Sequence, residues 1–255
     1  MPDHPIIEFR DVSYAVAGTL VLSGLKFEVQ PGETLVLLGR SGSGKTTTLK
    51  LINRLLSPTS GEVRIKGVPN TQLDLVALRR SIGYVIQDVG LFPHYTVERN
   101  IALVPWIMKW PEDRIRVRVK ELMQLTGLMP ELASRYPHQL SGGQRQRVGV
   151  ARALAADPEI LLMDEPFGAL DPLTRNELQQ EFLSLQRKLR KTIVLVTHDL
   201  REALRLGSRI ALMETGRLVA ALAPQEFLHS ADPAVSAYVR AFGDGLGTTL
   251  DRGAS

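Results

Sequence analysis

The chain has 255 residues, of which 44% are hydrophobic and 23% are charged, and this composition is typical of a globular protein. The net charge is +4, from 31 basic and 27 acidic residues, so charge permits binding to nucleic acid without indicating it. The absence of cysteine excludes disulfides, thiolate metal sites and cysteine nucleophiles. The amino terminus shows no secretory signal, and no apolar run approaches the roughly 18 residues of a membrane span. We therefore expect a cytosolic protein, or one held at a membrane by a partner.

The amino-terminal part of the chain predicts strands. Two segments rich in β-branched residues, 6–16 and 19–29, flank Gly18 and predict a hairpin beside the core of the protein. The apolar run 34–38 then predicts a buried strand, and the segment from Thr47 to Arg54 predicts a helix.

Residues 39–46, which join that strand to that helix, match the pattern Gly-x-x-x-x-Gly-Lys-[Ser/Thr] of a phosphate-binding loop. Glycines let the backbone approach a phosphate closely, and the amides of the loop and of the following helix point at the anion. Lys45 can reach the β- and γ-phosphates, and the hydroxyl of Thr46 can ligate Mg²⁺. The sequence therefore predicts a nucleotide site. Tyr14 in the hairpin is either a half-buried strand aromatic or a ring that stacks on adenine.

Three later apolar runs end on polar residues: one on Gln87, one on Asp164 and Glu165, and one on Thr197 and His198. The carboxyl ends of strands form the ligand-binding edge of an open α/β sheet. In a phosphate-loop protein the first carboxylate belongs with Mg²⁺, and Glu165 is placed to orient or deprotonate water. The alternatives are a surface turn for the two carboxylates and a structural role for the histidine.

The segment from Asp88 to about Asp157 has few strand signals, so we expect a helical insertion into the α/β core. A short helix over 97–104 is expected to end at Pro105. Apolar residues at helical spacing predict the next helix, whose basic residues we interpret as a solvated face rather than a nucleic-acid contact: Arg114, Arg116, Arg118 and Lys120.

Two further helix starts carry capping signals. Ser141 followed by Gln144 matches a capping box, and the two glycines between them suit an anion, although a purely structural cap fits as well. Asp171 before Pro172 predicts the start of another helix. Short strands are expected at 210–213 and 217–222, and a loose tail is expected after about Pro233.

These motifs, in this order, resemble those of the ATP-binding cassette (ABC) ATPases over almost the whole chain to about residue 243. The sequence Leu-Ser-Gly-Gly-Gln at 140–144 is highly specific for that family. The resemblance implies an α/β fold with a phosphate-loop (RecA-like) core, an antiparallel β subdomain and an inserted α-helical subdomain. The implied bounds are an ABC ATPase domain over 1–230, with its core at 1–87 and 158–230 and its helical subdomain at 88–157. Residues 231–255 would form a carboxyl-terminal tail without a regulatory domain.

The resemblance also implies roles for individual residues. Glu165 would be the general base, His198 would contact the γ-phosphate, and Gln87 would serve both catalysis and Mg²⁺. The nucleotide would be bound by Tyr14, Gly39, Arg40, Ser41, Gly42, Ser43, Gly44, Lys45, Thr46, Thr47, Gln87, Asp164 and His198. Metal ligation would come from Thr46, Gln87 and Asp164. A second copy of the chain would contribute, in trans, Ser141, Gly142, Gly143, Gln144 and Asp171.

The implied assembly is a homodimer that closes on two ATP molecules and docks transmembrane permease subunits near 88–110. An extracytoplasmic solute-binding protein would act indirectly, no nucleic acid would be bound, and the chain would lie on the inner face of a bacterial plasma membrane. Residues 52–61 and 79–105 are most similar to the ATPase subunits of importers for osmoprotectants such as glycine betaine, choline, carnitine or proline. Import of amino acids or another polar solute is the alternative, followed by a non-transport ABC ATPase.

Overall fold

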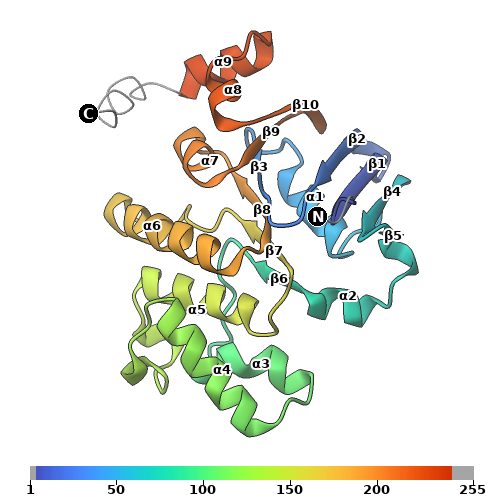
Figure 1. The fold of residues 1–255 in the computed structure, drawn as a ribbon. Coiled ribbons are helices and arrows are strands. Elements are labelled where there is room, and N and C mark those ends of the chain that lie inside the picture. The colour runs from blue at the N-terminus through green and yellow to red at the C-terminus, as the bar shows by residue number, and fades with distance from the viewer. Residues whose placement is uncertain (1–3, 243–255) are drawn as a thin grey trace. The chain divides into compact units, whose positions relative to one another are not determined.

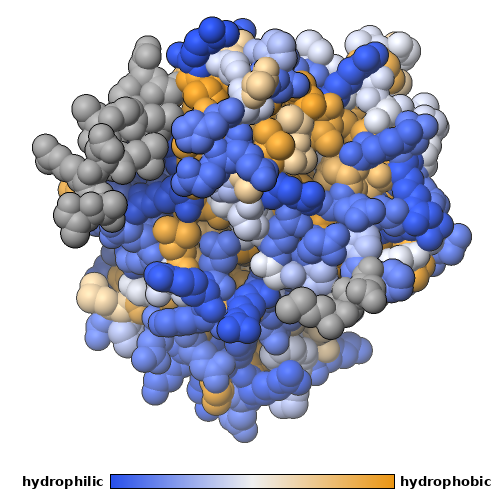
Figure 2. Space-filling view, turned by 45° about the horizontal axis from the view of Figure 1, so that its top comes forward, coloured by the Kyte–Doolittle hydropathy of each residue, from blue (hydrophilic) through white to orange (hydrophobic). Residues whose placement is uncertain are grey.

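The computed structural model describes residues 4–242, and the chain divides into two compact units. One unit contains the chain up to Asn70 and from Val194 onward, and the other contains Thr71–Ile193. Within residues 4–242, no helix is both long enough and apolar enough to cross a membrane. The face drawn in Figure 2 is largely hydrophilic, and apolar side chains emerge in patches among the polar ones.

The first unit contains an antiparallel sheet with the strand order β2-β1-β4-β5 (Figure 1). Its strands are β1 (Ile7–Val16), β2 (Thr19–Val29), β4 (Ser60–Ile65) and β5 (Val68–Pro69). The predicted hairpin is confirmed: Val16 pairs with Thr19, and the two turn residues Ala17 and Gly18 have φ angles of 48° and 81°. Positive φ at both central positions gives the turn that suits the twist of a two-residue hairpin.

The same unit holds the strand order β10-β9-β3-β8. The strands are β3 (Thr34–Leu38), β8 (Thr192–Thr197, which enters this unit at Val194), β9 (Arg209–Glu214) and β10 (Arg217–Leu222), with β3 and β9 parallel. Every residue of β3 is buried, as expected for a strand covered on both faces. The accompanying helices are α1 (Lys45–Ile52), α7 (Leu200–Leu206), α8 (Pro224–Leu228) and α9 (Pro233–Phe242).

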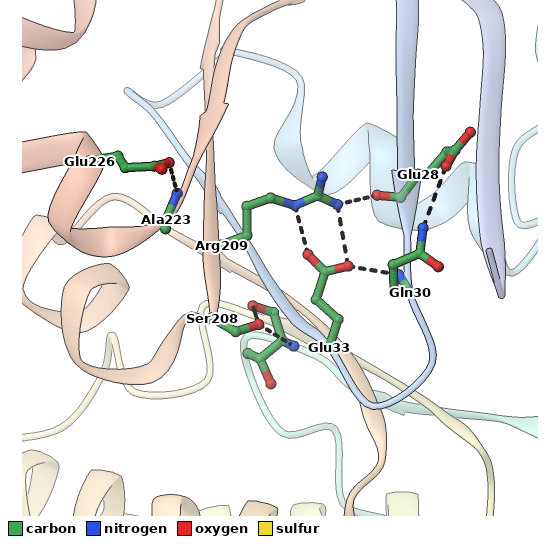
Figure 3. A network of polar contacts seen from close by, with 8 residues as sticks. Glu28, Gln30, Glu33, Ser208, Arg209, Ala223 and Glu226 are labelled. Atoms are coloured by element: carbon green, nitrogen blue, oxygen red, sulfur yellow. Dashed lines mark hydrogen bonds and ion pairs between the residues drawn. The ribbon is translucent and has the colours of Figure 1, made fainter. Parts of the chain in front are cut away.

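A polar cluster at the amino ends of β3 and β9 sets their register (Figure 3). The guanidinium of Arg209 pairs with Glu33 at 2.7 Å and donates to the backbone oxygen of Glu28. The amide of Thr34 donates to the hydroxyl of Ser208 at 3.0 Å, and that hydroxyl donates to the Thr34 carbonyl at 3.1 Å. These contacts at the start of the strands align their carboxyl ends, where the phosphate loop begins.

The loose tail expected after Pro233 is wrong for 233–242, which form α9. Val235 and Tyr238 of α9 are buried, and the carboxylate of Asp232 accepts from the amides of Ala234 and Val235. This cap and this burial stabilise a helix that the glycine-rich sequence beyond it conceals. The four glycines at 243, 245, 247 and 253 lie outside the described residues.

The second unit pairs β6 (Ile82–Val85) in parallel with β7 (Ile160–Asp164). Its helices are α2 (Leu75–Ser81), α3 (Val97–Ile107), α4 (Glu112–Leu125), α5 (Gly142–Leu154) and α6 (Pro172–Leu189), with 3₁₀ turns η2 (Pro130–Leu132) and η3 (Pro137–Gln139). A further 3₁₀ turn, η1 (Asn70–Gln72), lies where the units meet in sequence. Residues 88–157 contain helices and no strand, and α3, α4 and α5 pack together (Figure 1). The proposed domain bounds remain a prediction.

Two expectations for these helices are corrected. Pro105 does not end α3, which continues to Ile107, because a proline this close to the end of a helix removes only one of its last hydrogen bonds. Arg118 does not belong to a solvated face, because its guanidinium donates to the carbonyl oxygens of Leu154 and Ala155 at 3.0 and 3.3 Å. A cation there stabilises the carboxyl end of α5.

Candidate nucleotide-binding site

The loop from β3 to α1 folds around the side chain of Lys45. This residue is 4% exposed, and its ammonium group donates to the carbonyl oxygens of Gly39 and Arg40 at 2.8 Å each. Gly42 and Gly44 have φ angles of 80° and 96°, which few residues other than glycine adopt. The loop therefore encloses one cation with its own backbone.

Neighbouring atoms crowd the positions where side chains would start at the two ends of this loop. A Cβ atom at Gly39 would lie 2.3 Å from the carbonyl oxygen of Met213 in β9, and one at Gly44 would lie 2.4 Å from a methyl group of Leu22 in β2. The amide of Gly216, in the turn after β9, also donates to the carbonyl of Ser43 at 3.2 Å. Backbone of β9 and a β2 side chain thus fix the loop from outside.

The helix that follows the loop begins without an acidic residue in its first turn and without a side-chain cap at Gly44. Thr46 and Thr47 are half-buried there, while Thr48 is buried and its hydroxyl donates back to the Gly44 carbonyl at 3.0 Å. A helix start without a side-chain cap and without an acidic first turn is suited to an anionic ligand. The predicted loop residues Arg40 and Ser41 are exposed beside it.

Two other predicted residues lie in the same unit. His198 directly follows β8 and is exposed, and its carbonyl oxygen accepts from the hydroxyl of Tyr238 at 3.1 Å. Tyr14 lies in β1 opposite Leu22 of β2 and is half-buried. A half-buried ring fits a structural strand aromatic and an adenine-stacking residue equally well, so adenine stacking by Tyr14 stays a prediction.

The predicted carboxylates lie at the end of β7 in the second unit. Asp164 is the last residue of the strand and is 5% exposed, and the hydroxyl of Tyr84 lies 3.5 Å from its Oδ2. Burial raises the pKa of the Tyr84 phenol, and the negative charge of Asp164 raises it further, so the phenol stays a donor. Glu165 has a φ of 44°, a left-handed conformation that a residue with a side chain adopts only under constraint.

Gln87 does not lie directly at the end of its strand. The strand β6 stops at Val85, and Ile86 and Gln87 are exposed beyond it. The strand predicted from the sequence is one residue too long, because the apolar residue Ile86 extends the apolar run past Val85, the last residue of β6.

The capping box predicted at 141–144 is confirmed as the start of α5. The amide of Gln144 donates to the hydroxyl of Ser141 at 3.2 Å, and the amide of Ser141 donates to the Gln144 side chain at 2.9 Å. A Cβ atom at Gly143 would lie 2.8 Å from a methyl group of Thr174, so this glycine allows α5 to approach α6 closely. The side chains of Ser141 and Gln144 therefore have a structural function in the chain itself.

Asp171 is the predicted cap of α6, and its carboxylate accepts from the amides of Leu173 and Thr174 at 3.2 and 3.1 Å. Hydrogen bonds from Thr174 hold the pKa of Asp171 below its usual range, and the hydrogen bond from the Leu173 amide lowers this pKa by a smaller amount. The carboxylate is therefore ionised at neutral pH.

The predicted residues divide between the units. The first unit brings together the loop residues 39–47 and holds Tyr14 and His198, and the second holds Gln87, 141–144, Asp164–Glu165 and Asp171. Sequence reasoning missed Tyr84, Tyr238 and Met213. No local pattern predicts their contacts, because these join them to Asp164, His198 and Gly39, which lie 80, 40 and 174 positions away.

The predicted magnesium ligands are oxygen atoms on single residues of both units: Thr46 lies in the first unit, and Gln87 and Asp164 lie in the second. Within residues 4–242, no group of three or more His, Asp or Glu side chains could hold an ion. Magnesium typically takes one or two protein oxygens and completes its shell with phosphate and water. The hydroxyl of Thr46, the amide of Gln87 and the carboxylate of Asp164 are ligands of that kind.

Comparison with known families and structures decides the classification. The sequence model described as "ABC transporter" matches residues 22–168. The chain belongs to the ABC transporter family. The solved structure of cbiO1 from Clostridium perfringens, part of the ABC transporter complex cbiONQ, shares 30% identity and a TM-score of 0.82 over 98% of this chain and 100% of that one. The dimeric, post-hydrolysis ATP-binding cassette MJ0796 bound to ADP and Pi shares 35% identity and a TM-score of 0.76, over 86% and 98%. These matches confirm the predicted α/β ABC ATPase fold.

Curated relatives within the ABC family are similar over most of this chain. The glycine betaine/carnitine/choline transport ATP-binding protein OpuCA of Bacillus subtilis is 52% identical over 213 residues, which are 84% of this chain and 56% of the relative. The glycine betaine uptake system ATP-binding protein YehX of Escherichia coli is 56% identical over 214 residues, covering 84% and 70%. The chain thus spans little more than half the length of the first of these relatives.

Gly42 and Gly18 provide a matched test of the loop, because their φ angles are 80° and 81° and no atom lies within 4 Å of a Cβ built at either. Replacing either glycine with alanine should lower the free energy of unfolding by about 1–2 kcal/mol through backbone strain alone. Only Gly42→Ala should weaken ATP binding, by about tenfold or more, because it crowds backbone that must approach phosphate. Urea unfolding and titration with a fluorescent ATP analogue measure the two effects. Equal ATP affinity in both variants would contradict this account of the loop.

Proposed function

We propose that the chain is the ATP-hydrolysing subunit of an ABC importer, and that it energises uptake of a small polar solute. The observation that carries this proposal is a complete phosphate loop built around the buried Lys45, in a chain that also ends a buried strand on Asp164 and Glu165. A second carboxylate next to Asp164 suits a general base for hydrolysis. Family membership and the relatives' names support the transport context.

Binding of ATP is assigned to the first unit. Lys45 and the backbone amides of 39–47 bind the β- and γ-phosphates, and Tyr14 stacks on the adenine. Bound ATP supplies the phosphoanhydride bond that is hydrolysed. Two carbonyl oxygens hold the ammonium group of Lys45 within the loop, so its positive charge already lies in the segment that would receive the phosphates. His198 then contacts the γ-phosphate.

Hydrolysis is assigned to Glu165, which orients the attacking water and accepts its proton. The left-handed backbone at Glu165 turns the chain sharply after β7, and the amide of Gly168 donates to the Glu165 carbonyl at 3.2 Å. This fixed turn restricts where the carboxylate can reach. Asp164 and Gln87, with the hydroxyl of Thr46, are proposed to serve Mg²⁺, and Tyr84 holds the carboxylate of Asp164 in place.

The residues 141–144 and Asp171 are proposed to act on the nucleotide of a second copy of the chain. The dimeric state named for the MJ0796 cassette supports a homodimer. Helix α5 begins with glycines and a hydroxyl, and its first turn contains no acidic residue, so its amino end suits a negatively charged partner. The dimer would close on two ATP molecules and reopen after hydrolysis.

The transported solute is proposed to be a quaternary-amine osmoprotectant, such as glycine betaine, choline or carnitine. The support is 50–56% identity to ATP-binding proteins that are named for these solutes. Another polar solute is the alternative, because a sulfate/thiosulfate import ATP-binding protein of Bradyrhizobium diazoefficiens is 45% identical over 240 residues. A solute-binding protein outside the membrane would deliver the solute to the permease.

The permease is proposed to dock on the second unit near 88–110, which places the chain on the inner face of the membrane. A cavity of about 410 Å³ opens there between α3 and α4, lined by Tyr95, Glu98, Arg99, Ala102, Leu103, Trp106, Glu112, Ile115 and Arg116. Trp106 is 67% exposed, and its neighbours Ile107 and Met108 are exposed as well. Exposed apolar side chains around a groove with charged walls are typical of a binding site for a short helix.

Glu165→Gln tests the proposed activity. We expect kcat for ATP hydrolysis to fall by about 100-fold or more, because the amide cannot accept the proton, while ATP affinity changes less than about threefold. Glu159→Gln, just before the same strand, is the matched control and should hydrolyse ATP as wild type does. Steady-state phosphate release and nucleotide titration measure the two quantities. Hydrolysis by Glu165→Gln at near the wild-type rate would refute the assignment.

The lack of native cysteine allows a direct test of permease docking. With Trp106→Cys, a short bifunctional reagent should cross-link the chain to a membrane subunit in membranes that contain the assembled transporter. Met129→Cys, at a position that is 60% exposed and precedes η2, is the control and should give no such product. Mass spectrometry of the product identifies the partner. Cross-links from both positions, or from position 129 alone, would overturn the docking site.

A further inference from the structure

The carboxyl-terminal helix α9 ends in two aromatic rings, of Tyr238 and Phe242, that contact each other at a tilt of 33°. The ring centroids of Tyr238 and Phe242 are 4.5 Å apart. The other end of the helix is fixed, because Asp232 caps it, Val235 is fully buried and the hydroxyl of Ser236 donates to the Ser230 carbonyl at 2.7 Å. The two rings therefore belong to a helix whose other end is held in place by hydrogen bonds and burial.

These two rings contact both nucleotide-facing segments of the first unit. The hydroxyl of Tyr238 donates to the carbonyl oxygen of His198 at 3.1 Å. The guanidinium carbon of Arg40, in the phosphate loop, lies 5.6 Å from the centre of the Phe242 ring. A cation at this distance from a ring face is attracted to it. One helix thus touches the residue after β8 and the loop after β3.

The segment around His198 is held from its own side by short-range bonds. The amide of Asp199 donates to the hydroxyl of Thr197 at 3.0 Å, and that hydroxyl donates to the buried carboxylate of Glu202 at 2.6 Å. These contacts fix Thr197 and the start of α7. The contact from Tyr238 comes from a different element and acts on the peptide of His198 itself.

We propose that Tyr238 is a positioning residue for ATP hydrolysis: its hydroxyl holds the His198 peptide, and the contact of its ring with Phe242 ties that peptide to the phosphate loop through Arg40. This inference rests on the proposed function, because it assumes that His198 serves the γ-phosphate. It assigns a function in the reaction to a helix that lies outside the motifs of the sequence.

The environment of Tyr238 suits such a function. The residue is 4% exposed, and burial raises the pKa of its phenol to about 12, so the hydroxyl remains a donor at every pH where hydrolysis is measured. The positive charge of Arg40 lowers the pKa of the phenol, whereas the negative charges of Asp199 and Glu214 raise it. A buried hydroxyl without an acceptor costs free energy, so the bond to His198 restrains both partners.

Tyr238→Phe tests the proposal, because it removes the hydroxyl and keeps the ring against Phe242. We expect kcat to fall about 3- to 10-fold, in keeping with the loss of one neutral hydrogen bond, while KM for ATP changes less than about twofold. Hydrogen exchange should become faster in 198–201 and stay unchanged in 82–85. Tyr136→Phe, which deletes a hydroxyl in the second unit, is the control and should change neither quantity.

Each outcome has one meaning. Slower hydrolysis at constant KM, together with faster exchange at 198–201, supports the positioning function. A lower Tm with unchanged kcat would show that Tyr238 only stabilises the fold and would overturn the proposal, as would unchanged exchange. Failure of the proposed function is recognised separately: His198→Ala would then hydrolyse ATP as wild type does, whereas the exchange result is obtained without ATP.

Discussion

The ammonium group of Lys45, held at 2.8 Å by the carbonyl oxygens of Gly39 and Arg40, closes a loop whose two ends are crowded by neighbouring atoms. This closure requires that β9 lie directly beside β3, since the backbone of Met213 borders Gly39. The register in turn depends on Arg209, Ser208 and Glu33 at the opposite end of the strands (Figure 3). The polar cluster at one end of β3 and β9 therefore fixes the strand register on which the phosphate loop at the other end depends.

Much of this arrangement can be predicted from the sequence, because local signals agree with the fold. The hairpin around Gly18, the cap at Asp171 and the box at 141–144 depend on residues less than four positions apart, and all three are found as expected. The phosphate loop follows from a pattern with a strong physical basis. The ends of helices and strands are harder to predict from the sequence, as α3 shows by continuing through Pro105. The relatives in the ABC family support the same fold class.

Long-range partners could not be predicted, because they depend on how distant segments pack. No local signal predicts that Tyr84 lies beside Asp164 or that Tyr238 lies beside His198. Arg118 looked like one of several solvated basic residues, yet it binds the end of α5. Helix α9 was concealed by the glycines that follow it in sequence. The contacts of Arg118, Tyr238 and Tyr84 join residues 36, 40 and 80 positions apart.

The central claim is that each loop around Lys45 works with Ser141 of a second copy of the chain. Complementation between Lys45→Ala and Ser141→Arg tests it most directly, because each variant alone should be inactive. In a hybrid dimer, the intact loop of one chain meets the intact Ser141 of the other, so an equal mixture should regain about a quarter of wild-type ATP hydrolysis. If Ser141 served the loop of its own chain, no hybrid would contain a whole site. Hydrolysis by the mixture no faster than by the separate variants would contradict the claim.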